Sequence, residues 1–227
     1  MSITLDTIEF ATSPTPEAAV IVLHGLGADG NDFVPVAQML DPGVTVRYVF
    51  PHAPQIPVTI NNGYVMRAWY DIRHGDLTQR EDEAGLRQSR EAIDALIERE
   101  IARGIPASRI VLMGFSQGCA MTLLTGLRQS HTLAGLIGLS GYLPLPATTE
   151  AERNPANQQT PIFLAHGTED PVVPIERARA SRELLQSLGY HVTWHDYPIP
   201  HSVSPEEIAD INAFLTRVLA NKQGTGQ

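Results

Sequence analysis

The chain has 227 residues, 43% of them hydrophobic, with a formal net charge of −9 and one cysteine. This length and apolar content predict a single domain over residues 1–220, followed by a disordered tail over 221–227. The negative charge, without any lysine- or arginine-rich run, argues against a nucleic-acid or anionic-membrane partner. The absence of a long apolar segment and of a possible intramolecular disulfide predicts a cytoplasmic protein without an integral membrane segment.

Apolar runs separated by turn residues predict the strands. The first run has apolar residues at alternate positions, as in a half-exposed edge strand. The second is continuously apolar, as in a strand buried on both faces of a parallel sheet. The strands expected in this way cover residues 3–10, 18–23, 44–50, 109–113, 133–140, 161–165 and 191–197.

Apolar residues at helical spacing between these runs predict the helices. The last one begins with the capping sequence of Ser204 and Glu207, with Pro205 at the first helical position. Two segments are expected to lack regular structure: the proline-interrupted surface excursion 55–80 and the polar segment 146–159. The expected helices cover residues 33–40, 86–101, 120–127, 174–188 and 205–218.

This alternation of strands and helices predicts an α/β fold. The sheet is expected to be doubly wound and mostly parallel, with helices on both faces and no large cap domain. In such sheets ligands bind beyond the carboxyl ends of the strands. We therefore expect functional side chains in the loops that directly follow the strands.

The sequence G-x-S-x-G around Ser116 lies between a predicted strand and a predicted helix. In this context it predicts a nucleophile elbow, a sharp turn that exposes the serine hydroxyl above the sheet. Asp170 and His201 follow later strands, which gives the order serine, aspartate, histidine of an α/β-hydrolase. A serine hydroxyl needs an imidazole to take its proton, and the imidazole needs a carboxylate to orient it. We therefore predict Ser116, Asp170 and His201 as catalytic residues, with Glu169 and Asp196 as rival acids.

Acyl transfer also requires donors for the negative oxygen of the tetrahedral intermediate. One donor is expected to be the backbone N–H of Gln117, the residue after the nucleophile. The second is expected from the glycine-containing loop after the first buried strand. Leu26 is the choice there, because glycines flank it and let its peptide turn toward the serine.

Six segments together resemble the acyl-protein thioesterase and small carboxylesterase family. The resemblance runs from about residue 20 to about residue 219 and implies an α/β-hydrolase that needs no cofactor. It implies that the catalytic and oxyanion residues are those named above. The substrate it implies is a small acyl ester or thioester, a lysophospholipid or an acylated protein. It also makes a homodimer possible. The segments are HGLG (24–27), PHAP (51–54), WYD (69–71), GFSQG (114–118), LSGYL (139–143) and HGTEDPVVP (166–174).

Apolar residues near the predicted site are candidates for acyl binding: Trp69, Met66 and Val172. For Trp69 the alternative is that it only packs the excursion onto the sheet. Two positions depart from the family pattern, which usually has glycine where Cys119 stands and glycine before the histidine, where this chain has Pro200. Proline fixes φ and removes an N–H in the loop that carries His201.

Other functions and roles compete with this prediction. His24 and His166 precede glycine at strand ends and are expected to brace loops, and no histidine pattern predicts a metal site. Cys119 could be a reactive thiol, but a small buried apolar residue is the favoured interpretation. The same scaffold could serve a peptidase or lactone hydrolase, or a non-catalytic binding protein.

Overall fold

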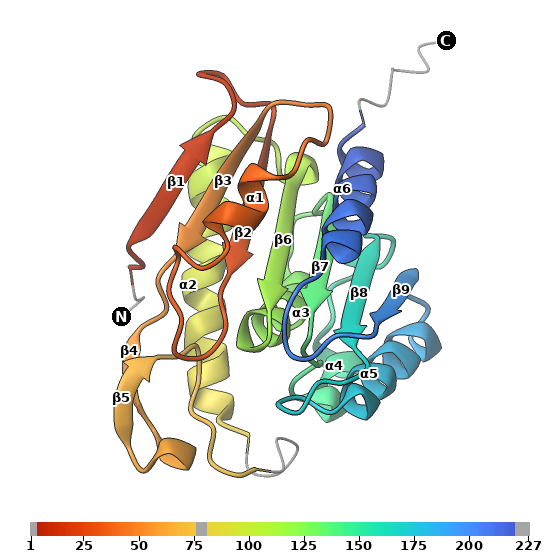
Figure 1. The fold of residues 1–227 in the computed structure, drawn as a ribbon. Coiled ribbons are helices and arrows are strands. Elements are labelled where there is room, and N and C mark those ends of the chain that lie inside the picture. Colours follow the sequence, from red (N-terminus) through yellow and green to blue (C-terminus); the bar gives the residue numbers. More distant parts are fainter. Residues whose placement is uncertain (1–3, 76–80, 221–227) are drawn as a thin grey trace.

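A seven-stranded sheet runs through the molecule in the order β1-β3-β2-β6-β7-β8-β9 (Figure 1). The structure is a computed structural model that describes residues 4–75 and 81–220, so the tail predicted over 221–227 lies outside the described residues. Neighbouring strands are parallel, except that β1 pairs with β3 in the antiparallel sense. The strands are β1 (Thr7–Ala11), β2 (Ala18–Leu23), β3 (Val46–Pro51), β6 (Ile110–Phe115), β7 (Gly135–Leu139), β8 (Ile162–Gly167) and β9 (Val192–Tyr197).

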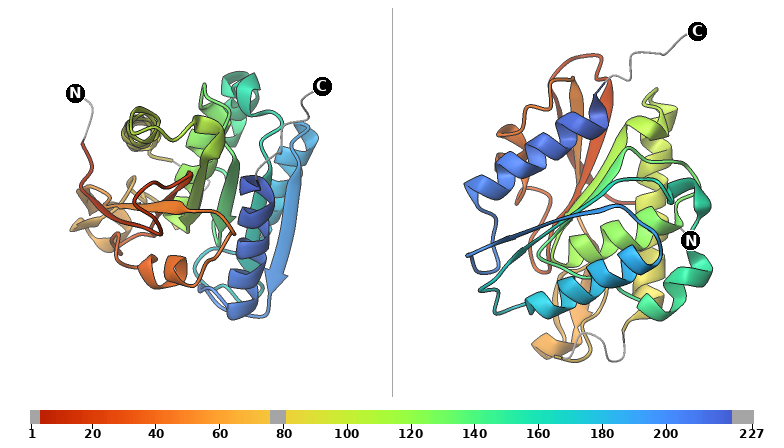
Figure 2. Two further views of the ribbon diagram at one scale, coloured as in Figure 1. Left: turned by 90° about the horizontal axis from the view of Figure 1, so that it is seen from above. Right: turned by 90° about the vertical axis from the view of Figure 1, so that its right-hand side faces the viewer.

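Helices cover both faces of this sheet. Helices α2, α3 and α5 lie on one face, and α1 and α6 lie on the other (Figures 1 and 2). The fold is therefore the doubly wound α/β arrangement that the sequence predicts, and no large cap domain covers the described part of the chain. The helices are α1 (Val34–Gln38), α2 (Glu83–Ala102), α3 (Gln117–Arg128), α4 (Pro146–Glu152), α5 (Ile175–Ser187) and α6 (Pro205–Leu219).

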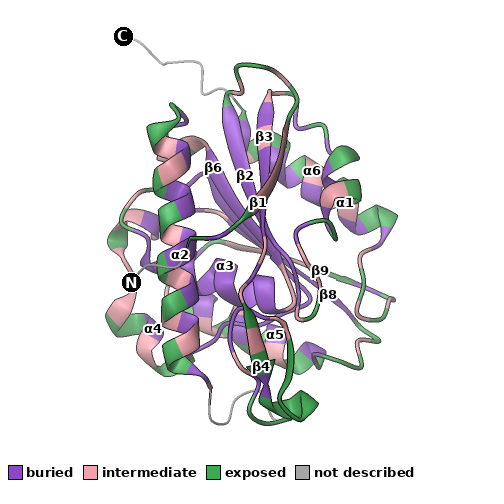
Figure 3. Cartoon of the chain, turned by 90° about the vertical axis from the view of Figure 1, so that its left-hand side faces the viewer, coloured by how far each residue is buried: buried purple, intermediate pink, exposed green. Residues whose placement is uncertain are grey.

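Strand β2 shows why these residues form a central strand. All six of its residues are buried, and alternate side chains enter opposite cores, with Ile21 and Leu23 on the α2 and α3 face and Val20 and Val22 on the α6 face. Figure 3 shows this continuous burial through the middle strands, while the outer surfaces of the helices are exposed. Each buried apolar side chain of this size contributes on the order of 2 kcal/mol.

Residues 55–75 contradict the prediction that the segment 55–80 lacks regular structure, whereas residues 76–80 lie outside the described part of the chain. Strands β4 (Gln55–Val58) and β5 (Tyr64–Arg67) form an antiparallel hairpin around a short 3-10 turn, Thr59–Asn61, and the hairpin projects from the body of the molecule (Figure 1). Pro57 pairs with Val65 inside it. The prediction is wrong because each strand of a two-stranded ribbon has an open edge, and a proline whose N faces that edge removes no hydrogen bond between the strands.

The segment 146–159 contradicts its prediction in the same way, because it contains α4 and a short 3-10 turn, Pro155–Asn157. Pro146 is the first residue of α4, where its fixed φ suits a helix and its missing N–H would have had no partner. Tertiary ion pairs hold the helix, since Arg87 and Arg128 both lie 2.7 Å from carboxylate oxygens of Glu152. These arginines, Arg87 first, lower the pKa of Glu152 to about 2.

The remaining predicted elements are present with small shifts at their ends. The predicted cap of the last helix is also present, because Ser204 Oγ accepts a hydrogen bond of 3.1 Å from the backbone N–H of Glu207. None of the helices over residues 4–75 and 81–220 has the length and apolar content needed to span a bilayer.

A pH dependence of stability is expected from Glu207, which is 1% exposed and whose pKa burial raises to about 7. Its folded pKa exceeds that of the unfolded chain, so its stabilising contribution is complete below pH 4.5 and is lost as pH rises through about 7. Glu207→Gln should therefore gain stability over the native protein between about pH 5 and about pH 8, by up to about 3 kcal/mol. Urea unfolding at both pH values measures this. The exposed neighbour Glu206, changed to Gln, is the control, and an equal response of both variants would contradict the assignment.

Candidate active site

Ser116 occupies a strained turn between β6 and α3. Strand β6 ends at Phe115, α3 begins at Gln117, and Ser116 between them has φ 56° and ψ −116°. A non-glycine residue in this region costs on the order of 1–3 kcal/mol and persists only where its surroundings enforce it. Here the backbone N–H of Ser116 donates to the carbonyl of Leu139 at 2.9 Å. The structure therefore has the strand, turn and helix context that the nucleophile-elbow prediction requires.

Asp170 and His201 meet at the carboxyl edge of the sheet. The Nδ1 of His201 lies 2.6 Å from Oδ2 of Asp170, and the Asp170 side chain is fully buried while that of His201 is 16% exposed. The other oxygen, Oδ1, accepts the backbone N–H groups of Val172 and Val173 at 2.8 and 2.9 Å. Because the carboxylate can only accept, His201 carries its proton on Nδ1 and leaves Nε2 free to act as a base.

Two contacts bring the Ser116 turn close to these groups. The ring of Phe115, the residue before the serine, packs against His201 at a centroid distance of 4.7 Å. A Cβ atom added to Gly25 would lie 3.3 Å from Cβ of Ser116. The hydroxyl of Ser116 makes no hydrogen bond within the described part of the chain. Catalytic hydrogen bonds often tighten only when substrate is bound.

Pro200 does not prevent the contact between His201 and Asp170. The loop uses its remaining backbone groups, since the N–H of Ser202 donates to the carbonyl of Pro200 at 2.8 Å and the N–H of Glu169 donates to Ile199 at 3.2 Å. The missing N–H of Pro200 therefore leaves the loop connected to its neighbours.

The two predicted oxyanion donors also lie at this edge. Gln117 is the first residue of α3, so its N–H is one of the groups at a helix N-terminus that have no partner within the helix. Leu26 lies in the loop whose glycine, Gly25, is next to Ser116. Within the described residues the N–H of Leu26 donates no hydrogen bond, whereas that of Gly27 donates to Arg67 at 2.8 Å.

The Gln117 side chain has a further role that the sequence analysis missed. It is buried, its Oε1 accepts the backbone N–H of Trp69 at 3.0 Å, and its Nε2 donates to the carbonyl of Tyr70 at 3.0 Å. The indole of Trp69 in turn donates to the carbonyl of His24 at 2.8 Å. These bonds join the elbow, the segment 69–70 and the loop after β2. A buried glutamine in the motif was the available signal, because a buried amide must find partners.

The two histidines predicted to brace loops do so. Nδ1 of His24 donates to the carbonyl of Gly25 at 2.7 Å, and Nε2 accepts the N–H of Ala53 at 3.0 Å. Burial lowers the pKa of His24 to about 4, so its ring stays neutral at ordinary pH. Nε2 of His166 donates to the carbonyl of Val173 at 2.8 Å.

Cys119 is a buried packing residue, as the favoured interpretation holds. It is 1% exposed, and burial raises the pKa of its thiol to about 12. A Cβ atom added to Gly138 or Gly141 would lie 2.8 Å from its sulfur. The absence of side chains at Gly138 and Gly141 therefore leaves room for the Cys119 side chain, at a position where the family usually has glycine.

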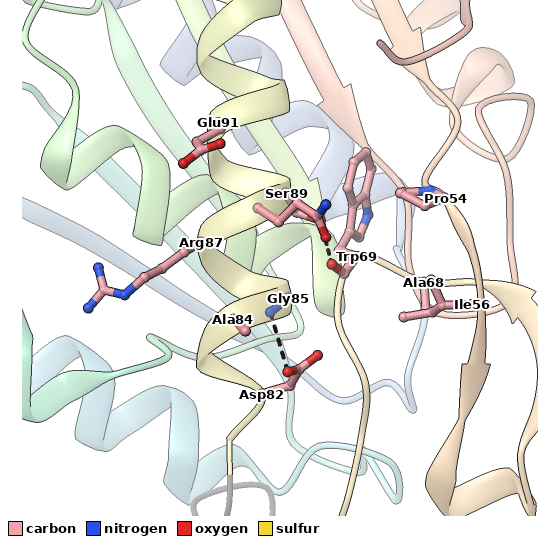
Figure 4. Close-up of a pocket in the computed structure, with 11 residues that line it drawn as sticks. Pro54, Ile56, Ala68, Trp69, Asp82, Ala84, Gly85, Arg87, Ser89 and Glu91 are labelled. Atoms are coloured by element: carbon pink, nitrogen blue, oxygen red, sulfur yellow. Dashed lines mark hydrogen bonds between the residues drawn. The ribbon is translucent and has the colours of Figure 1, made fainter. Parts of the chain in front are cut away.

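The three residues predicted to bind the acyl group lie in different environments. Trp69 is 1% exposed, Met66 is partly buried with its sulfur 3.7 Å from a Cβ atom added to Gly27, and Val172 is 58% exposed. Trp69 also lines a pocket of about 520 Å³ on the α2 side, where Ser89 donates to its carbonyl (Figure 4). None of Ser116, Asp170 and His201 lines that pocket.

No cluster of three or more histidine, cysteine, aspartate or glutamate side chains suited to a metal ion occurs in residues 4–75 and 81–220. The histidines at the carboxyl edge instead contact a carboxylate or a backbone carbonyl, as His201, His24 and His166 do.

A doubly wound sheet with a strained serine turn and a histidine–aspartate pair at its carboxyl edge defines the α/β-hydrolase class. The phospholipase/carboxylesterase family matches residues 7–219. The chain belongs to that family.

Curated relatives and solved structures support the same grouping. Acyl-protein thioesterase 1 of Gibberella zeae is 43% identical over 94% of this chain and 95% of its own length, and that of Yarrowia lipolytica is 41% identical over 87% and 90%. Among solved structures, SOBER1 of Arabidopsis thaliana has a TM-score of 0.83 at 31% identity, covering 89% of this chain and 99% of its own. Acyl-protein thioesterase 2 of Zea mays has a TM-score of 0.81 at 28% identity, covering 93% and 99%.

The chain is therefore an enzyme of the serine hydrolase type that cleaves carboxylic ester or thioester bonds. This agrees with the predicted fold and function. The peptidase, lactone hydrolase and non-catalytic alternatives are not favoured by these relatives.

Replacing Gln117 is expected to destabilise the protein. Gln117→Ala would leave the buried N–H of Trp69 and carbonyl of Tyr70 without their side-chain partners, and the expected loss of unfolding free energy is at least about 2 kcal/mol. Chemical denaturation measures this loss. Gln117→Glu is the matched control: it keeps an acceptor for Trp69, and its stability should recover in acid, where a protonated carboxyl can donate to Tyr70. An alanine variant as stable as the native protein would contradict the role.

Cys119 should resist alkylation in the folded protein. Its raised pKa leaves almost no thiolate near neutral pH, and its burial excludes the reagent. Mass spectrometry after iodoacetamide treatment should find labelling only once denaturant is added. Rapid labelling of the native protein would show that this helix turn opens.

Proposed function

We propose that Ser116, His201 and Asp170 form the catalytic triad of this esterase or thioesterase. The observation that supports this most is the 2.6 Å contact between His201 and Asp170, beside the strained turn that carries Ser116. Glu169 and Asp196 are less suited as the acid, because Asp170 is the carboxylate that holds the histidine.

In the proposed mechanism, Oγ of Ser116 attacks the carbonyl carbon while Nε2 of His201 takes the hydroxyl proton. The proton on Nδ1 stays bonded to Asp170, whose negative charge stabilises the imidazolium. Collapse of the tetrahedral intermediate breaks the bond to the alcohol or thiol, which leaves with the proton from His201. Water then attacks the acyl-enzyme by the same route and releases the acid.

The oxyanion is proposed to bind the N–H groups of Leu26 and Gln117. Each such donor contributes about 3 kcal/mol to transition-state stabilisation. His24 bonds the carbonyl of the peptide that carries the Leu26 N–H, and the Gln117 side chain is anchored to the segment 69–70, which supports donors that are held before substrate arrives.

For the substrate we propose an acyl ester or thioester with an apolar chain, including acylated protein or lysophospholipid. The support is a group of partly buried apolar residues, Leu26, Met66 and Ile56, which we call the acyl wall, and the exposed Val172 beside Asp170. Ile56 pairs with Met66 across the β4–β5 hairpin, and the sulfur of Met66 lies 3.7 Å from a Cβ atom added to Gly27, the residue after Leu26. Trp69 is proposed to pack behind this wall rather than to contact the substrate, because it is almost fully buried.

We further propose a single catalytic domain over residues 1–220, a cytoplasmic location, and a homodimer as the alternative to a monomer.

Hydrolysis of p-nitrophenyl esters from acetyl to palmitoyl tests this proposal. Ser116→Ala should abolish turnover, while Asp170→Asn should lower kcat by about 10⁴-fold, since the histidine loses its orienting carboxylate. Double replacements should be far from additive because the three side chains act as a unit. The chain length with the highest kcat/KM measures the reach of the acyl site, and a matched thioester series separates the two bond types.

Two controls separate mechanism from folding. Fluorophosphonate labelling should modify the native protein and not Ser116→Ala, and Glu169→Gln should keep most of the activity because the rival acid does not hold His201. If Glu169→Gln were inactive and Asp170→Asn active, the assignment of the acid would be overturned.

A further inference from the structure

His166 lies beside the proposed acid but takes no part in the mechanism above. Its side chain and that of Asp170 are both 0% exposed, and its Nε2 lies 3.4 Å from Oδ2 of Asp170. This is the same carboxylate oxygen that His201 contacts at 2.6 Å. A second histidine therefore faces the atom on which the orientation of the first depends.

His166 and Asp170 hold the same residue, Val173, from its two sides. Nε2 of His166 donates to the carbonyl of Val173 at 2.8 Å, and the N–H of Val173 donates to Oδ1 of Asp170 at 2.9 Å. The first bond ties the far end of the turn 170–173 back to β8. It thereby fixes the peptide groups that occupy Oδ1 and leave Oδ2 for His201.

His166 is protonated on the nitrogen that faces Val173, so it can donate a hydrogen bond to the carbonyl there. The carbonyl of Val173 can only accept, so the proton is on Nε2, and Nδ1 is buried without a partner among the described residues. A second proton, on Nδ1, would leave a buried N–H donor without an acceptor among the described residues, and burial lowers the pKa of His166. Burial therefore favours the neutral ring, which donates through Nε2.

We propose that His166 is a positioning residue for Asp170, acting on the reaction through the turn at Val173. The inference rests on the proposed function, because it concerns the reaction only if Asp170 orients His201. Misplacement of catalytic groups by about 1 Å can cost on the order of 100-fold in rate. Loss of the bond to Val173 should therefore lower kcat and leave KM, which depends on the acyl wall, nearly unchanged.

A matched pair of variants tests the proposal. His166→Gln keeps an N–H donor at the distance of Nε2, whereas His166→Asn carries the same amide one methylene shorter and cannot reach Val173. We expect the asparagine variant to lose about tenfold or more in kcat with KM within about twofold, and the glutamine variant to recover most of that loss. His131→Asn makes the same change at a surface histidine and should leave both constants unchanged.

A double-mutant comparison shows whether His166 acts through Asp170. In an Asp170→Asn background, His166→Asn should cost less than about threefold, because the carboxylate it positions is gone. Equal kcat for the asparagine and glutamine variants, or a full further loss in that background, would overturn the proposal. If Asp170→Asn alone kept its activity, the proposed function would fail instead, and the inference with it.

Discussion

The sharp turn at Ser116 depends on three backbone segments that meet with no side chain between them. A Cβ atom on Gly114 would overlap the carbonyl of Gly118, and one on Gly118 would overlap the carbonyl of Leu23. Strand β6, helix α3 and strand β2 can approach this closely only because both positions are glycine. The strained φ of Ser116 is the local cost of that approach, and the burial of β6 and α3 on all sides offsets it.

From this turn, hydrogen bonds connect the loops at the carboxyl edge of the sheet. The Gln117 side chain reaches the segment 69–70, and the Trp69 indole reaches the loop after β2 at His24. On the other side, His166 closes the turn that carries Asp170. The loops therefore hold their shape through buried polar contacts rather than through apolar packing alone, which suits a site that must be organised before substrate binds.

The two departures from the family pattern are accommodated locally. The sulfur of Cys119 lies where Gly138 and Gly141 have no side chains, so the additional volume does not push α3 away from β7. Pro200 precedes His201 without breaking its contact with Asp170, since neighbouring N–H groups supply the loop's hydrogen bonds. Both changes lie next to the proposed catalytic residues but leave their backbone connections intact.

The sequence by itself determined the order of strands and helices, the elbow around Ser116 and the post-strand positions of Asp170 and His201, because apolar periodicity and glycine spacing are local properties. It was wrong at the β4–β5 hairpin and at α4, where local proline content suggested loops but cross-strand pairing and the Arg87 and Arg128 contacts to Glu152 stabilise regular structure. The sequence also indicated that His24 and His166 brace loops, but only the tertiary structure showed what the Gln117 side chain bonds to. The hydrogen bond between Gln117 and Trp69 joins residues 48 positions apart, and no spacing rule predicts a hydrogen bond between groups so far apart in the chain.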